Sequence, residues 1–309
     1  MKNKKSKITI KTLKKDFKQY WVLYLMFLPI LGYIILFGYV PMVGVSMAFL
    51  DFRPRLGYFG SEFIGFENFT RFFSSPSFWK IVRNTFSINL LDLFLGFPTP
   101  IIFALLLFEM SNKYLRKTVQ SIAIAPHFIS TVVLCGMITL FSRQGGWLNS
   151  LVATLTGVEQ PYLLEVPKYY YPIYLISAIW AGVGFSSIVY YAALCGVDRC
   201  LFEAAQIDGA GRIRQTISIT IPSILPTIII MFILRMGGLF AVGLDKSLLL
   251  QTKLNENVSE VLSTYVYKKG LLANDYGYGM ATSLFSAAVN LTFLLVTNTI
   301  ARKTETSLW

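Results

Sequence analysis

The sequence predicts an all-α membrane protein with six transmembrane helices. Hydrophobic residues make up 54% of the 309 residues and charged residues only 14%, whereas soluble domains carry about 25% charged residues. Six apolar runs are each long enough to cross a bilayer core, which requires about 20 helical residues. These predicted spans lie near 21–44, 85–108, 119–141, 169–196, 222–243 and 279–301.

The distribution of basic residues predicts that both termini lie in the cytosol. With the N-terminus inside, the cytosolic segments contain 16 Lys and Arg residues and the outer segments contain 11. An excess of positive charge marks the cytosolic side of a membrane protein. We therefore expect a basic cytosolic tail at 1–20, one transmembrane domain at 21–301 and a short cytosolic tail at 302–309.

The Lys-rich N-terminal tail allows two interpretations. A basic cluster of this kind could contact nucleic acid. Directly before a span, it is more often an orientation signal and a contact for anionic lipid. We therefore expect membrane lipid, and no nucleic acid, as its partner.

Several kinds of catalytic and metal chemistry are missing from the sequence. It contains no GxxxxGK[ST] motif for binding ATP phosphates. His127 is the single histidine, and the three cysteines have no zinc-binding spacing. Asp92 is the only acidic residue in the predicted spans, so no pair of catalytic carboxylates can be assembled there. We expect no catalytic residues, no metal and no cofactor on this chain.

Two predicted outer segments leave alternatives open. Segment 45–84 is rich in aromatic residues, which next to a span usually form an interfacial belt or pack, although some could stack on a ligand. Segment 244–278 is the most polar outer stretch. It could pack over a pore mouth or receive a partner.

The charged, glycine-broken segment 198–221 lies between two apolar runs. Asp198 to Ile207 can form one short helix, and Gly209 and Gly211 allow a sharp turn. Beyond the turn, isoleucines at positions 213, 217 and 221 predict a second short helix. The resulting compact knob would present Glu203 and Asp208 to a groove in a soluble partner, where a carboxylate can pair with arginine. An ordinary solvated loop is the alternative.

The residues of this loop resemble the EAA loop of permease subunits of ATP-driven importers. The similarity is carried by Glu203, Ala204, Ala205, Gly209, Ile219 and Pro222. Further stretches are similar to the carbohydrate-importing branch and, within it, to permeases for oligosaccharides, aldouronates and polysaccharides. They are Tyr191–Leu194, Pro126–Ser130, Thr264–Tyr267 with Gly270, and Ser307–Trp309. Phe202 and Ile221 depart mildly from the usual Tyr and Leu.

This resemblance implies the fold of a type I ABC importer permease in the bacterial cytoplasmic membrane. It implies a heterodimer with a second, homologous permease, two ATPase subunits that bind ATP and Mg, and an extracytoplasmic solute-binding protein that delivers a carbohydrate. In the family the loop glutamate sits in a cleft of the ATPase. That role is carried onto Glu203, with Ala204 and Ala205 beside it and Asp208 and Gly209 shaping the elbow.

Polar and aromatic residues within the predicted spans are candidates for a sugar path. Arg235 could pair with a uronate carboxylate. The alternatives are a structural ion pair with Asp92 or contact with helix-end carbonyls. For Trp180 and Tyr190 helix packing is the alternative to sugar contact, and for Asn290 it is a hydrogen bond between helices. For His127 the alternative is a hydrogen bond to backbone freed by Pro126. Trp180 and Tyr190 are about 80° apart around a straight helix, so both could face one wide path.

We therefore predict a permease subunit, not an enzyme, that imports oligosaccharides or polysaccharide fragments, acidic ones included. A small sugar or glycerol phosphate is the alternative cargo. A stand-alone secondary transporter is the alternative mechanism, although a proton-coupled carrier would normally need more membrane carboxylates than Asp92 alone.

Overall fold

The computed structural model describes residues 10–158 and 161–302, and most of these residues are helical. The long helices are α1 (Ile10–Ile34), α4 (Phe78–Leu95), α5 (Pro98–Glu109), α6 (Lys113–Ile124), α7 (Thr131–Ser142), α9 (Pro167–Cys195), α12 (Ile221–Met236) and α16 (Tyr276–Ala301). Shorter helices are η1 (Ile35–Tyr39), η2 (Val40–Phe49), α2 (Gly57–Gly60), α3 (Glu67–Phe73), η3 (Ala125–Phe128), α8 (Trp147–Thr156), η4 (Leu163–Glu165), α10 (Arg199–Ile207), α11 (Arg212–Gln215), η5 (Thr216–Thr220), α13 (Leu244–Leu250), α14 (Glu256–Ser259), α15 (Leu262–Val266) and η6 (Tyr267–Leu272). One antiparallel pair joins β1 (Leu50–Asp51) to β2 (Glu62–Phe63).

Five helical segments among the described residues are long and apolar enough to cross a membrane. They are Gln19–Phe49, Phe78–Glu109, Pro167–Cys195, Arg212–Met236 and Tyr276–Ala301. A sixth span is present if the bent pair of α6 and α7 is counted as one. Five of the six predicted spans thus correspond to continuous helical segments, and the third corresponds to the bent pair.

The break lies in the predicted third span. Segments Lys113–Phe128 and Thr131–Ser142 are bent by 94° relative to each other. Pro126 falls within the short helix η3 and cannot donate a backbone hydrogen bond. The backbone of Ile129 and Ser130 is then extended, and the Ser130 hydroxyl accepts from the Val133 amide at 3.3 Å to start α7. The expectation of one continuous helix at 119–141 is therefore corrected.

The other spans also differ from the apolar runs at their ends. The second helix begins at Phe78, seven residues before the predicted 85, because helical backbone continues through polar residues that an apolar window excludes. The fifth segment begins at Arg212 and its helix ends at Met236, before the Gly237–Gly238 pair. Residues 1–9 and 303–309 of the predicted tails lie outside the described residues, and α1 begins at Ile10, within the first tail.

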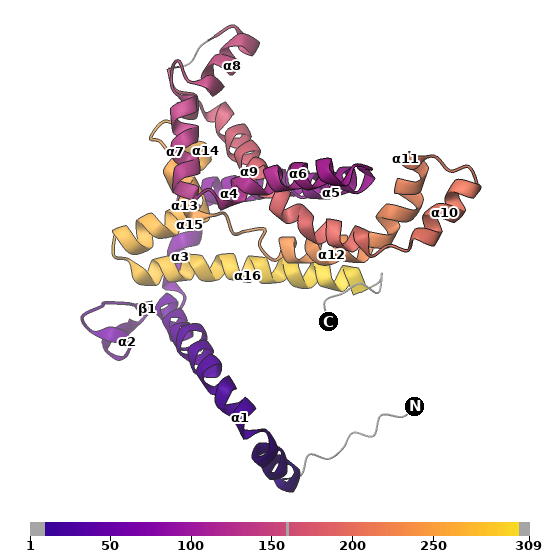
Figure 1. The fold of residues 1–309 in the computed structure, drawn as a ribbon. Coiled ribbons are helices and arrows are strands. Elements are labelled where there is room, and N and C mark those ends of the chain that lie inside the picture. Colours follow the sequence, from indigo (N-terminus) through magenta and orange to yellow (C-terminus); the bar gives the residue numbers. More distant parts are fainter. Residues whose placement is uncertain (1–9, 159–160, 303–309) are drawn as a thin grey trace.

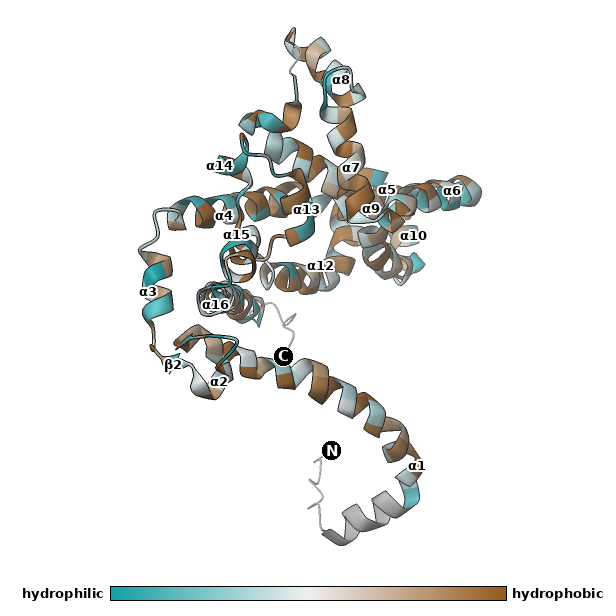
Figure 2. Ribbon diagram, turned by 90° about the vertical axis from the view of Figure 1, so that its left-hand side faces the viewer, coloured by the Kyte–Doolittle hydropathy of each residue, from teal (hydrophilic) through white to brown (hydrophobic). Residues whose placement is uncertain are grey.

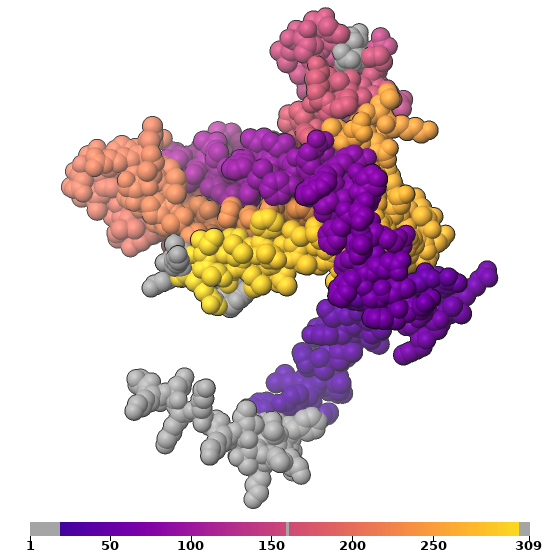
Figure 3. Space-filling model, turned by 180° about the vertical axis from the view of Figure 1, so that it is seen from behind, coloured from indigo at the N-terminus to yellow at the C-terminus, as the bar shows by residue number. Residues whose placement is uncertain are grey.

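Helices α1 and η1 of the first span stand apart from the other helices as an arm (Figures 1 and 3), whereas η2 at the end of this span packs against α16. No residue in the apolar 18-residue window of the first span is buried within the chain. Much of the arm is brown in Figure 2, and its large apolar side chains are exposed. The arm is therefore a surface for lipid or for other protein, not part of this chain's own core.

The remaining helices pack around three apolar clusters, one of which uses the aromatic segment 45–84. Phe72 is fully buried there and contacts the rings of Phe78, Tyr265 and Phe285. Other rings of the segment, including Phe59 and Phe63, are exposed. Segment 45–84 thus contributes to packing as well as to the surface.

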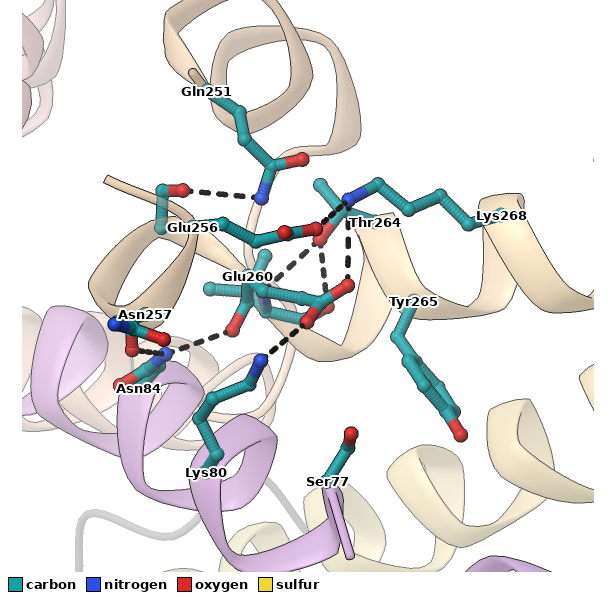
Figure 4. A network of polar contacts seen from close by, with 12 residues as sticks. Ser77, Lys80, Asn84, Gln251, Glu256, Asn257, Glu260, Thr264, Tyr265 and Lys268 are labelled. Carbon is teal, nitrogen blue, oxygen red and sulfur yellow. Dashed lines mark hydrogen bonds and ion pairs between the residues drawn. The ribbon is translucent and has the colours of Figure 1, made fainter. Parts of the chain in front are cut away.

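The polar segment 244–278 packs against α4 through a network of ion pairs and hydrogen bonds (Figure 4). Glu260 lies 2.9 Å from the ammonium of Lys80 on α4 and 3.4 Å from that of Lys268. Lys268 also contacts Glu256 at 2.6 Å. The Asn84 amide donates to the backbone carbonyls of Asn257 and Glu260. This network, which we call the outer clamp, ties the segment to the helical body.

Candidate functional site

The loop between α9 and α12 forms a capped helix that ends in a sharp turn. The Asp198 carboxylate accepts from the Cys200 amide at 3.0 Å and starts α10. At the other end Gly209 has φ +75°, and the Ala210 amide donates to the Ala205 carbonyl at 2.8 Å. This is the usual termination of a helix by a left-handed glycine. The predicted helix from Asp198 to Ile207 and the turn at Gly209 are confirmed.

The second helix of the loop differs from the prediction. It is not a separate short helix, because α11 continues without interruption through η5 into α12 as one helical segment, Arg212–Met236. Gln215 holds the turn to this segment by donating from its side-chain amide to the Ala210 carbonyl at 2.7 Å. The turn is therefore joined to a membrane span by uninterrupted helix.

The surface of the elbow carries both charge and apolar area. Glu203 and Asp208 are exposed, and Ala205 is half-buried beneath them. Ile207 is 87% exposed at the tip, and Ile213 is 78% exposed on the following helix. The sequence reasoning missed Ile207 as a surface residue, although an isoleucine next to an Asp-Gly turn is a usable signal. Exposed apolar residues beside charged residues, as here, are typical of a surface that contacts another protein.

A hollow of about 660 Å³ lies between the elbow and the end of α5. Glu203, Phe202 and Arg212 line it on the loop side, and Phe108 and Glu109 line it on the α5 side. The rings of Phe108 and Phe202 are 6.0 Å apart and anchor the loop to the membrane helices. Glu203 thus stands at the rim of a concave surface.

A second cavity, of about 390 Å³, lies between the spans. We call it the span cavity. Its wall combines a polar pair, aromatic rings and a strip of small residues on α9. Its lining includes Asp92, Gly96, Phe97, Ala178, Gly182, Ser186, Tyr190 and Arg235.

The charged pair in this wall joins two different spans. The Arg235 guanidinium at the end of α12 contacts the Asp92 carboxylate on α4. The Arg235 side chain is 45% exposed and that of Asp92 is 19% exposed. The structural ion pair considered from the sequence is therefore present, and it leaves part of the guanidinium open to the cavity.

Comparison with known proteins gives this arrangement its context. Residues 19–306 match the model of the family described as binding-protein-dependent transport system inner membrane component. The chain belongs to this family.

Similar curated proteins include two from Bacillus subtilis (strain 168). The polygalacturonan/rhamnogalacturonan transport system permease protein YteP is 38% identical over 98% of this chain and 92% of its own length. Protein LplB is 39% identical over 91% of this chain and 88% of its own length.

Solved structures show the same fold. A chain of a bacterial ABC transporter involved in the import of the acidic polysaccharide alginate is 37% identical, with a TM-score of 0.87 over 94% of this chain and 98% of that chain. The alginate transporter in complex with an alginate pentasaccharide-bound periplasmic protein gives a TM-score of 0.86, with 95% of this chain covered. Membership in this family of transport components favours the permease prediction over a stand-alone carrier or a membrane enzyme.

The permease places Trp180 and Tyr190 at different cavities. Tyr190 is buried and lines the span cavity. Trp180 lines a separate apolar cavity of about 570 Å³ together with Trp147 and Phe141. The two rings therefore do not share one cavity.

Asn290 and His127 make packing contacts in the permease. The Asn290 side-chain oxygen accepts from the Phe240 amide at 2.6 Å, and Ser286 donates to the Phe240 carbonyl at 3.0 Å. This is the hydrogen-bonding alternative considered for Asn290. The His127 ring stacks on Phe185 with the centroids 4.0 Å apart and the planes within 4°, an interaction that the sequence did not indicate.

Small residues of the span cavity were also missed. Ala178, Gly182 and Ser186 recur at every fourth position of α9, which places them on one helix face. An added Cβ at Gly182 would have no atom within 4 Å, so the helix wall is open there. The signal that could have found this face is the regular spacing of small residues within a span of large ones.

Proposed function

We propose that this chain is one membrane half of an ATP-driven importer for oligosaccharides or polysaccharide fragments, acidic ones included. The observation that carries the proposal is the elbow at Gly209, which exposes Glu203, Asp208 and Ile207 and is continuous with a membrane span. A partner that binds this elbow can move the span. The names of the similar Bacillus protein and of the solved alginate importer support a polysaccharide cargo.

The proposed assembly contains a second, homologous permease and two ATPase subunits in the bacterial cytoplasmic membrane. ATP and Mg bind to the ATPases. Each ATPase receives one elbow in a cleft, with Glu203 as the charged contact, Ala204 and Ala205 as the close-packed face, and Asp208 and Gly209 setting the turn. Both termini lie in the cytosol, so a reporter fused after Trp309 is expected to give a cytosolic signal.

A solute-binding protein would deliver the carbohydrate from the outside, and the span cavity is the proposed part of its path in this chain. Arg235 and the Tyr190 hydroxyl supply hydrogen-bond donors, and Phe97 supplies an aromatic face. Small-molecule pockets combine mostly apolar walls with a few placed polar groups in about this way. For His127 and Asn290 the packing contacts described above favour structural roles, and Trp180 lines a different cavity.

The coupling role is tested by Glu203→Lys in the reconstituted transporter. Loss of a charge-assisted contact lowers an equilibrium constant about tenfold or more, so ATP-dependent uptake and copurification of the ATPase should both fall at least that far. The matched control is Glu62→Lys, which reverses an exposed charge in the hairpin of β1 and β2. Normal ATPase binding and uptake in Glu203→Lys would remove the proposed role of the elbow.

A further inference from the structure

The ion pair between Asp92 and Arg235 has a feature that a purely structural pair does not require. It lies in the wall of a cavity, and its cationic partner is the more exposed of the two side chains. We propose that Asp92 is a resident counter-ion which a carboxylate of the cargo displaces from Arg235. The span cavity would thereby select for anionic sugars. This inference rests on the proposed importer function and adds the basis of its selectivity.

In the membrane, replacing Asp92 at Arg235 by a cargo carboxylate is more favourable than separating Asp92 from Arg235 with no replacement. Asp92 lies midway along the segment Phe78–Glu109. An unpaired guanidinium within a membrane is costly, so Arg235 needs an anionic partner in each state. A cargo carboxylate can supply that partner without leaving the guanidinium uncompensated, whereas a neutral sugar cannot.

The geometry of the guanidinium permits this exchange. Arginine presents five donors in a planar fork and can hold a carboxylate through two parallel hydrogen bonds. Because the Arg235 side chain is 45% exposed, part of the fork already faces the cavity before Asp92 leaves. An incoming carboxylate can therefore bind the open edge first.

Gly96 allows Asp92 to adopt its position beside Arg235. An added Cβ at Gly96 would lie 2.1 Å from an oxygen of the Asp92 carboxylate and 2.8 Å from the Asp92 carbonyl oxygen. The carboxylate is thus folded back over the end of its own helix. Any side chain at position 96 would push it away from this position and weaken the pair.

The opposite wall of the cavity has room for a sugar ring. Gly182 offers no side chain, and an added Cβ would meet nothing within 4 Å. The cavity volume of about 390 Å³ falls within the range of roughly 300–1,000 Å³ for small-ligand sites. Tyr190 and Phe97 stand beside this space, so a single sugar residue would meet an aromatic face and the open edge of Arg235 together.

The test compares an acidic oligosaccharide with its neutral counterpart of nearly the same shape. The probes are labelled trigalacturonate and its fully methyl-esterified form, and their binding to the complete transporter in nanodiscs is measured without the solute-binding protein. We expect the wild type to bind trigalacturonate about tenfold more tightly than the ester, in line with one charge-assisted contact. Equal binding of the two probes would overturn the proposal.

Two variants separate the roles of the paired residues. Arg235→Gln should remove the preference for the acid. Asp92→Asn removes the resident competitor and should strengthen binding of the acid about tenfold, with no change for the ester. Unchanged binding of the acid in Asp92→Asn, or a preference that survives in Arg235→Gln, would refute the exchange.

Further variants keep the test valid if Asp92→Asn folds poorly. Gly96→Ala retains both charges but crowds the carboxylate, so it should also strengthen binding of the acid; weaker or unaltered binding contradicts the exchange. The double variant Asp92→Asn/Arg235→Gln leaves neither charge of the pair in the cavity. It should fold, and it should bind the acid and the ester equally.

ATP-dependent uptake of the two probes is measured separately. Uptake of neither probe by the wild type would count against the importer function itself, whereas equal uptake of both would count only against the selectivity.

Discussion

Lys80 on α4 lies 2.9 Å from Glu260, whose side chain is only 9% exposed and also faces Lys268 at 3.4 Å. A nearly buried carboxylate is thus shared by two lysines from separate parts of the chain. Because Glu260 also offers its backbone carbonyl to Asn84, it contacts α4 through both its side chain and its backbone.

We predict that Glu260→Gln loosens this segment. Removing the carboxylate leaves two lysine charges without their shared partner, and since both lysines are about one-third exposed, the expected loss is about 1–2 kcal/mol. Thermal unfolding and limited proteolysis within 244–278 measure it. Glu62→Gln serves as the control because Glu62 is exposed. Equal protease resistance of the two variants would show that the clamp does not hold the segment.

The outer clamp should also depend on pH in both directions. The hydrogen bond from Lys268 holds the pKa of Glu256 below its ordinary value of 4.5. Burial alone would lower the pKa of Lys268, but its hydrogen bond to Glu256 and the nearby charges outweigh this effect and raise the pKa above 10.5. The stabilisation by Glu256 is therefore lost as the pH falls through its lowered pKa, and that by Lys268 is lost as the pH rises through its raised pKa.

Amide hydrogen exchange of segment 244–278 across this range tests the pH prediction. Protection should be highest between about pH 5 and pH 10. Glu256→Gln should reduce the decrease on the acid side, because one of the two carboxylates of the clamp is removed, while the alkaline side retains a contribution from Glu260. An acid limb that is the same in the variant and the wild type would assign the decrease to other groups.

Gly209 should be sensitive to substitution while Gly211 should not. Gly209→Ala puts a side chain at φ +75°, which costs about 1–2 kcal/mol for a non-glycine residue. Gly211 has φ −68° and no atom within 4 Å of an added Cβ. We expect Gly209→Ala to weaken ATPase copurification and Gly211→Ala to behave as the wild type. The reverse order would mean that the elbow geometry does not determine docking.

Gly184 should be essential for packing at the bend between α6 and α7. An added Cβ would lie 2.1 Å from the Ala123 carbonyl oxygen, so Gly184→Ala must push α9 away from the bend. Overpacking of this kind costs about 1–3 kcal/mol, which should appear as a lower unfolding temperature of the purified complex. Gly182→Ala, two residues away in open space, is the matched control. A Gly184→Ala protein as stable as this control would show that the helices can separate at no cost.

The sequence by itself determined the membrane class, the apolar runs and the elbow. Each of these depends on local properties: about 20 consecutive apolar residues for a span, and glycines such as Gly209 for a sharp turn. It also showed that Arg235 and Asp92 are rare charges within apolar segments. Local chemistry is visible in local sequence, so these features could be predicted without coordinates.

Tertiary structure alone decided how distant segments meet. Arg235 pairs with Asp92, which is 143 positions away in the chain, and the third span is broken at Pro126. The second loop helix is continuous with a span, and Trp180 and Tyr190 lie at separate cavities. Pro126 and the close approach of Gly184 to Ala123 occur together at the bend, and a proline within an apolar run is compatible with a straight or a broken span. Contacts between residues far apart in the chain depend on how whole helices pack, and helix packing is not encoded in any single window of sequence.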